Sequence, residues 1–547
     1  MYKLWIRFAV AFAVMGSVNT STAAPLSLEP AAMPAIATVD IRYQSYNIEM
    51  AEIVGGNFWK PYDQKSDQKN GTKSDRKNPT VPEPRPTALA PDTGRPPLQI
   101  GKGEMFQARP PIDLENARLR KLAAALGPAY VRVSGTWANS VYFHDSDSPP
   151  PAAPPKGFTS VLSRSEWKRV VDFAQAVNAK IMTSFAISQG VRNAADIWTT
   201  DQAQNLLTYT KSVGGEIAAV EFFNEPNLPT EGGAPARYSA ADFARDFAIF
   251  HRFIKAEAPG ILIAGPGTVG EGDALPIAAT NMPSLTTIDI FAATAPPRFD
   301  IYSYHSYPAA SIRCALIGQG AQTTKSDALS DEWLARSDQI HGFYLRLRDR
   351  FEPGKPVWIT ETADAACGGN PWASTFLDSF RYLDQLGWLA KSAIKAVFHN
   401  TLASSDYGLI DQDTFTPRPN YWAALLWRKL MGTTVLDAGR LWPGLKLYAH
   451  CLPGHSGGVT LLAINNSKTR TQLLELPMAS DRYTLAAHQL DGIDVQLNGE
   501  ILELQADDKL PALEGKHIPA GYVELSPASI TFLTVAKAGN PDCHVAE

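Results

Sequence analysis

The chain has 547 residues, of which 45% are apolar and 19% are charged, and its net charge is −5 at pH 7. This length exceeds one small domain and can bury a large core. The modest negative charge gives no sign of the basic stripe that nucleic-acid binding needs, so we expect no nucleic-acid partner. It also provides no strong general attraction for a polyanionic substrate.

Residues 1–24 predict a secretory signal peptide. Basic residues open the chain, the apolar run 8–15 follows, and Thr22-Ala23-Ala24 offers small residues for cleavage. That run is too short to span a bilayer, and no later stretch is long and apolar enough to do so. We therefore expect a secreted or periplasmic protein that starts near Pro25 and has no membrane attachment after cleavage.

Eight strand candidates alternate with helical segments, which predicts a parallel α/β fold. The strands are expected at 40–50, 129–134, 180–187, 218–223, 261–264, 300–305, 356–360 and 394–400. The helices between them are expected to include 114–126, 165–176, 241–258, 331–350, 373–389 and 420–430. Eight strand-and-crossover units close a (β/α)8 TIM barrel, to which we assign residues 40–432.

Residues 61–104 interrupt this pattern after the first strand. The segment is polar and then rich in proline, so it cannot bury a core, and it is predicted to be a mobile insertion on the catalytic face. It is either a tolerated insertion without function or a flap that shapes access to the site.

The pattern changes again near residue 433. Short alternating runs at 445–449, 458–465, 472–476, 482–488 and 529–535 are separated by turn residues, and no long helical period follows. This pattern predicts a β-sandwich domain over residues 433–547. The segment 25–39 precedes the first barrel strand and could add an edge strand to that sandwich.

Two glutamates end strands that lie far apart in the sequence, in Asn224-Glu225-Pro226 and in Thr360-Glu361-Thr362. The carboxyl ends of barrel strands point their side chains into one shared pocket. A retaining glycosidase needs two carboxyl groups there, and we predict Glu225 as the acid/base and Glu361 as the nucleophile. Alternatively, both carboxylates could cap helices or pair with arginine.

Polar residues at neighbouring strand ends complete the predicted site. Asn224 beside the acid can bond the sugar 2-hydroxyl. Burial and the charge of Glu361 are expected to raise the pKa of Glu225. His305 and Tyr307 can orient the nucleophile or line the sugar pocket, or they belong to a packed aromatic cluster. Arg132 on the second strand would need a buried partner, and Glu361 is the expected one.

Three further residues are candidates for contacts with sugar. Tyr46 and Asn47 belong to a dense polar set at the end of the first strand that could bond sugar hydroxyls. Trp137 could stack on a sugar ring or pack in the core.

No pattern in the sequence indicates a metal or a cofactor. Helical His-x-x-x-His spacing and Walker motifs are absent, and the G-x-G-x-x-G spelling at 265–270 is followed by prolines rather than by a helix. We therefore expect neither a metal nor a cofactor.

The four cysteines allow three pairings. Cys314 and Cys367 both follow predicted barrel strands on the same face, which favours Cys314–Cys367 and leaves Cys451–Cys543. Free buried thiols are the alternative.

These motifs resemble the heparanase and β-glucuronidase family, glycoside hydrolase family 79. The matching segments are 223–227, 357–362 with Gly368-Gly369, 405–411 and 419–422, and the similarity runs from about residue 40 to residue 440. The resemblance implies that Glu225 is the acid/base and Glu361 the nucleophile, and that the loop Ser405-Asp406-Tyr407 meets a uronic-acid carboxylate, partly through backbone N–H groups. The family carries Gly-Asn before that tyrosine, so either Asp406 points outward or the preferred sugar is neutral or modified.

The resemblance therefore implies a retaining glycoside hydrolase that acts on a glycan or glucuronide. We expect the protein to be a monomer. We expect an exo-acting β-glucuronidase that releases terminal β-D-glucuronic acid. The alternatives are an endo-acting, heparanase-like enzyme on a uronate-containing polysaccharide and a non-catalytic carbohydrate-binding homologue.

Overall fold

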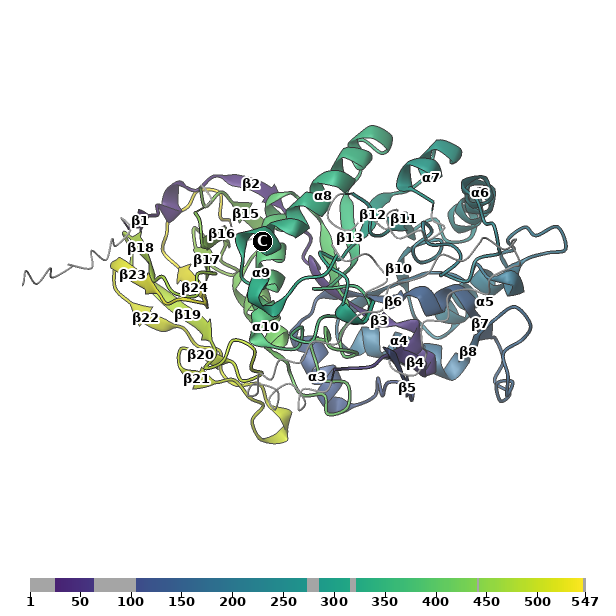
Figure 1. The fold of residues 1–547 in the computed structure, drawn as a ribbon, viewed down its shortest axis with the longest axis horizontal. Helices are drawn as coiled ribbons and strands as arrows, with labels where there is room; N and C mark the ends of the chain where they lie inside the picture. The colour runs from purple at the N-terminus through teal and green to yellow at the C-terminus, as the bar shows by residue number, and fades with distance from the viewer. Residues whose placement is uncertain (1–24, 63–104, 273–284, 315–320, 440–441, 545–547) are drawn as a thin grey trace, which may run out of the picture.

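The computed structural model describes residues 25–62, 105–272, 285–314, 321–439 and 442–544. The predicted signal peptide and residues 63–104 of the predicted insertion lie outside these ranges. Figure 1 shows a barrel ringed by helices and, beside it, a region built from strands.

Eight parallel strands close into a barrel in the order β10-β11-β12-β13-β14-β3-β6-β9, which confirms the predicted (β/α)8 fold. In chain order they are β3 (Gln44–Glu49), β6 (Ala129–Ser134), β9 (Ala179–Thr183), β10 (Ile217–Val220), β11 (Leu262–Thr268), β12 (Ile301–Ser306), β13 (Val357–Thr362) and β14 (Ala396–His399). Each strand overlaps its predicted range, and only the ends differ.

Helices cover the outside of the barrel (Figure 1). They are α3 (Ala117–Ala125), α4 (Arg164–Ala176), α5 (Asp201–Ser212), α6 (Ala240–Glu257), α7 (Thr287–Ala293), α8 (Asp331–Phe351), α9 (Phe376–Lys391) and α10 (Pro419–Leu430). Ser163 and Ser239 begin α4 and α6 with reciprocal capping boxes, so their starts are fixed by local hydrogen bonds.

The barrel interior is apolar at one end and polar at the other. Side chains from several strands, including Tyr130, Trp358 and Phe398, form a cluster that fills the barrel at the start of the strands. Polar side chains such as Asn47 and Arg132 occupy the other end and are fully buried. The functional groups are therefore confined to the carboxyl ends of the strands.

The C-terminal region is a β-sandwich, as predicted. Its large sheet has the order β2-β15-β16-β17-β24-β19-β20-β21, with β22 paired to β19, and its small sheet has the order β1-β18-β23. The strands are β1 (Leu26–Ser27), β2 (Ala35–Thr38), β15 (Thr434–Leu436), β16 (Leu445–Cys451), β17 (Val459–Asn465), β18 (Gln472–Leu476), β19 (Ser480–Ala486), β20 (Gln496–Leu497), β21 (Glu500–Ile501), β22 (Lys516–Ile518), β23 (Gly521–Leu525) and β24 (Ser529–Val535).

Alternation along the strands of the large sheet explains how it packs. Leu461 and Leu533 face the small sheet, whereas Leu462 and Phe532 join the core that includes the barrel helices. Residues from both ends of the described chain meet here, because β1 pairs with β18 and β2 pairs with β15.

Short elements extend the loops at the carboxyl end of the barrel. The helix α1 (Met50–Val54) follows β3 and leads into β4 (Gly56–Trp59), which pairs antiparallel with β5 (Phe106–Arg109). The parallel pair β7 (Val141–His144) and β8 (Ser160–Ser163) follows the 3-10 turn Thr136–Ser140.

Both predicted disulfides are confirmed: Cys314 bonds Cys367, and Cys451 bonds Cys543. The first joins the loops that follow β12 and β13, and the second ties the end of the described chain to β16. Within the described ranges, no helix combines the length and the apolar character that crossing a membrane requires.

Candidate active site

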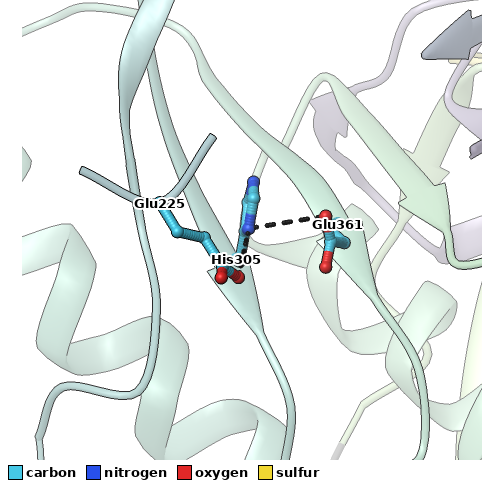
Figure 2. Close-up of side chains that lie close together, drawn as sticks. All are labelled: Glu225, His305 and Glu361. Carbon is cyan, nitrogen blue, oxygen red and sulfur yellow. Dashed lines mark hydrogen bonds and ion pairs between the residues drawn. The ribbon is translucent and has the colours of Figure 1, made fainter. Parts of the chain in front are cut away.

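The structure brings Glu225, His305 and Glu361 together at the carboxyl end of the barrel (Figure 2). One nitrogen or oxygen of each side chain lies within 4.8 Å of the others. His305 Nδ1 is 3.0 Å from Glu225 Oε1 and 3.6 Å from Glu361 Oε2. The two glutamates that the sequence singled out therefore face each other across one histidine.

Glu361 is surrounded by groups that favour its ionised form. Arg132 donates to Glu361 Oε2 over 2.9 Å, and the Tyr307 hydroxyl donates to Oε1 over 2.6 Å. Burial acts to raise the pKa of Glu361, but the electrostatic effects of His305 and Arg132 and the Tyr307 hydrogen bond outweigh it and hold that pKa below its usual range. These partners therefore favour the ionised form of Glu361 although the residue is buried.

Glu225 is shifted in the opposite direction. Burial raises the pKa of Glu225 and the charge of Glu361 adds to this effect, although the hydrogen bond from His305 counters them in part. Its side chain is 15% exposed, and its backbone adopts a φ of +50°, which non-glycine residues rarely do. The pKa values of the two carboxyl groups in this pocket are thus shifted in opposite directions, Glu225 upward and Glu361 downward, which is the pattern that separates an acid from a nucleophile.

Arg132 on β6 connects the two strands associated with the glutamates, β13 and β10. Besides Glu361, it donates to Glu221 Oε1 over 2.5 Å and to Asn224 Oδ1 over 2.7 Å, and its side chain is fully buried. The predicted pairing with Glu361 is confirmed. Glu221 was not predicted: it directly follows β10, and nothing in the sequence distinguishes a glutamate that pairs with arginine there.

A third carboxyl group, Glu49 at the end of β3, lies close to Glu361. Burial raises its pKa well above the usual value, and the charge of Glu361 adds to the increase. Gly135 packs directly on this carboxyl, and a Cβ there would lie only 1.5 Å from Glu49 Oε2. Glu52, whose pKa burial raises to about 7, accepts from the Ser404 hydroxyl nearby. Only the strand end around Glu49, not its role, was visible in the sequence.

The loop after β14 carries Ser405, Asp406 and Tyr407. Ser405 has a φ of +65°, and its hydroxyl donates to the Gly368 carbonyl over 2.9 Å. The Asp406 carboxylate accepts from the Tyr62 amide at 3.1 Å and from Arg313 at 3.0 Å. Burial raises the pKa of Asp406 to about 7 despite Arg313. This carboxylate therefore turns to Tyr62 and Arg313, and its charge is balanced there.

Asn47 and Tyr46, the two candidates on β3, point to opposite sides of the barrel wall. Asn47 points into the barrel, where its amide donates to the Thr360 carbonyl over 3.2 Å. Tyr46 points the other way, into the core between barrel and helices near Tyr421 on α10. The prediction that Tyr46 bonds sugar is therefore wrong, because adjacent residues of a strand face opposite sides.

Trp137 joins an aromatic cluster with the β4–β5 hairpin. Its ring centroid is 5.1 Å from that of Phe58 and 6.4 Å from that of Phe106. The ring is half-buried, so it lies at the rim of the site rather than in the barrel core.

The three clustered side chains have the donor atoms of a metal site, but the surrounding charge opposes a cation. Arg132, whose guanidinium is always charged, lies 2.9 Å from Glu361 Oε2, so a positive charge already adjoins the carboxylate that a metal would need. The pair of carboxyl groups is better suited to proton transfer and nucleophilic attack.

A (β/α)8 barrel that aims two carboxyl groups at one point from its fourth and seventh strands is the architecture of a glycoside hydrolase. No protein-family model matches the chain. Mouse heparanase is 28% identical over 491 residues, covering 79% of this chain and 88% of that protein. Bovine heparanase is 29% identical over 409 residues, covering 71% of each chain. The chain is a homologue of the heparanases, which confirms the resemblance seen in its motifs.

A further sequence relative and a solved structure are also similar to the chain. A human protein named inactive heparanase-2 is 25% identical over 411 residues, covering 70% of this chain and 66% of that protein. Among solved structures, a 4-O-alpha-L-rhamnosyl-beta-D-glucuronidase from Fusarium oxysporum superposes with a TM-score of 0.59. It is 12% identical and covers 93% of this chain and 100% of that one, so the likeness shows the shared fold.

Proposed function

We propose that the protein is a retaining β-glucuronidase that releases terminal β-D-glucuronic acid from glycans or glycoconjugates. The observation that carries the proposal is the opposite pKa shift of two carboxyl groups that approach within 4.8 Å. Retaining glycosidases separate these groups by about 5–5.5 Å, whereas inverting ones leave about 6.5–9.5 Å for a water.

The proposed reaction has two steps. Neutral Glu225 gives its proton to the glycosidic oxygen while Glu361 attacks the anomeric carbon, so the leaving group departs as an alcohol and a glycosyl ester forms. The charge of Glu361 is then lost, which lowers the pKa of Glu225. Ionised Glu225 takes a proton from water, which attacks the anomeric carbon and frees Glu361. His305 bonds Glu225 and lies near Glu361 in the same pocket.

The backbone amides of Gly369 and Tyr407 support a uronate as the substrate group. A Cβ on Gly369 would lie 3.3 Å from the Tyr407 amide nitrogen, so the two backbones are adjacent. Neither amide donates a hydrogen bond to another described residue. Because Asp406 bonds Arg313 and Tyr62, its charge does not oppose a carboxylate here. We assign Ser405 and Tyr407 to the loop that binds the uronate, and Asn224 to the 2-hydroxyl.

An endo-acting, heparanase-like enzyme on a uronate polysaccharide is the second candidate, because the heparanase relatives carry that name. A non-catalytic homologue is the third, since one relative is named inactive. The intact, oppositely shifted glutamate pair favours catalysis. Two disulfides fit an oxidising compartment, so we retain secretion or export to the periplasm as part of the proposal.

Purified protein assayed on an aryl β-D-glucuronide and on heparan sulfate tests the proposal. We expect turnover of the aryl glucuronide, with the β-anomer of glucuronic acid as the first product in proton NMR. The Glu361→Gln variant should be inactive on both substrates. A first product with the α configuration, or rapid shortening of heparan sulfate before any monosaccharide forms, would refute the corresponding part of the proposal.

A further inference from the structure

Residues 56–62 form a strap across the rim of the barrel. The strap begins with β4, and Trp59 pairs with Phe106 on β5, where their ring centroids are 4.6 Å apart. Phe58 packs on Trp137, which follows β6. This end of the strap, which is part of the loop that follows β3, therefore rests on β5 of the same loop and on the loop that follows β6.

The middle of the strap rests on the loop that follows β13. The Trp59 Cβ is only 2.5 Å from where a Cβ on Gly368 would lie, so the two backbones are in close contact. Gly368 precedes Gly369, whose amide we assigned to the uronate. Trp59 also packs against the cluster that contains Tyr307 and Tyr407. The Trp59 indole therefore packs against residues that line the proposed sugar pocket.

The far end of the strap is fixed by polar contacts to two more loops. The Tyr62 amide donates to Asp406 after β14, and its hydroxyl bonds Ser311 over 2.8 Å. Arg313, after β12, donates to the Lys60 carbonyl and lies 3.8 Å from the centroid of the Tyr62 ring. These contacts explain why a buried aspartate stands at position 406.

The anchors follow the order of strands around the barrel. The strap itself belongs to the loop that follows β3, and the loops that it contacts follow β6, β14, β13 and β12; these five strands are neighbours in the barrel, in the order β6, β3, β14, β13 and β12. Glu225 follows β10, outside this sector. Because the acid must stand at the leaving group, the strap lies on the opposite, non-reducing side of the bound sugar.

The orientation of the sugar ring in the proposed site indicates which hydroxyl faces the strap. Its anomeric carbon lies between the two glutamates, Asn224 meets the 2-hydroxyl, and the amides of Gly369 and Tyr407 meet the carboxylate on carbon 5. Carbon 4 is opposite the anomeric carbon of a pyranose, so the 4-hydroxyl points toward the strap. Resting on the function proposed above, we propose that Trp59 and Phe106 exclude substituents on this hydroxyl and so restrict the enzyme to unsubstituted chain ends.

The test compares two aryl β-D-glucuronides, one with a free 4-hydroxyl and one with a neutral sugar on that hydroxyl. We expect the wild type to prefer the free substrate, and Trp59→Ala to reduce that preference in kcat/KM by about tenfold or more. Tyr522→Ala, which removes a 65% exposed aromatic side chain on β23, serves as the matched control and should leave the preference unchanged. Phe106→Ala is the second variant if Trp59→Ala does not fold.

Equal rates on the two substrates in the wild type would overturn the proposal. So would a selective loss of activity on the substituted substrate in Trp59→Ala, because the rings would then be a stacking platform. The role of the strap can also be tested without turnover. Calorimetry measures the binding of glucuronic acid and of its 4-O-glycosylated form to the variant Glu361→Gln and to the double variant Glu361→Gln/Trp59→Ala. Selective binding that depends on Trp59 without any turnover would refute the glucuronidase but support the strap, whereas binding that ignores Trp59 refutes the strap.

Discussion

The hydrogen bond from Tyr307 to Glu361 can be removed without changing the shape of the pocket. Tyr307→Phe deletes only the hydroxyl, which donates to Glu361 Oε1 over 2.6 Å and accepts from the Asn400 amide over 3.0 Å. Asn400 keeps a second partner, the Tyr407 hydroxyl at 3.2 Å. The substitution therefore isolates one bond to the proposed nucleophile.

The size of the effect follows from the charge and burial of the acceptor. A hydrogen bond to an ionised group contributes about 1.5–3 kcal/mol, and each pH unit corresponds to about 1.36 kcal/mol. Because this bond lowers the pKa of Glu361, its loss raises that pKa. Glu361 must be ionised to attack, so the acid limb of the kcat/KM profile should move to higher pH by about one to two units.

The assay is a pH profile of kcat/KM on an aryl β-D-glucuronide. Tyr302→Phe is the matched control, because Tyr302 lies on β12, the strand that Tyr307 directly follows, is fully buried and has no hydrogen-bond partner for its hydroxyl among the described residues. The acid limb should stay in place in the control. An unmoved acid limb in Tyr307→Phe, or a displacement to lower pH, would contradict the electrostatic account of the site.

Three further predictions concern the same glutamates and their supports. Glu225→Ala should be rescued by azide on substrates with good leaving groups and give a β-glycosyl azide; an inverted azide product from Glu361→Ala would instead show that the roles are exchanged. Arg132→Met should lower the free energy of unfolding by about 3–5 kcal/mol in denaturant titrations, because it leaves two buried carboxylates without their partner; a change below about 1 kcal/mol would contradict the charge network. The substitution Cys314→Ser removes the Cys314–Cys367 bond and opens a loop with a sequence separation of 53 residues, which should lower the free energy of unfolding by about 4 kcal/mol. If the wild-type exported protein instead contained two thiols that can be alkylated, this bond would not form.

The sequence by itself determined the barrel and its two central glutamates. Buried parallel strands are apolar runs that end in polar residues, and the helices between them carry serine caps, so both signals are local. Once eight strands close, every strand end faces one pocket, and Glu225 and Glu361 must meet there. The Cys314–Cys367 pair followed from the same rule, since both residues come after strands on one face.

Only the tertiary structure decided which polar residues serve that pocket. Glu49, Glu221 and Glu361 all sit at or just after strand ends. The different pKa shifts of Glu49 and Glu361, and the pairing of Glu221 with Arg132, depend on which loops and which arginine lie against them. Tyr46 was misplaced because a shift of one residue reverses the face of a strand.

The direction of Asp406 was also beyond the sequence. Its partners, Tyr62 and Arg313, come from loops that are neighbours only after the barrel closes. The strap formed by residues 56–62 was likewise beyond the sequence. Its anchors are far apart in the chain, and the order of strands around the barrel decides which of them come into contact.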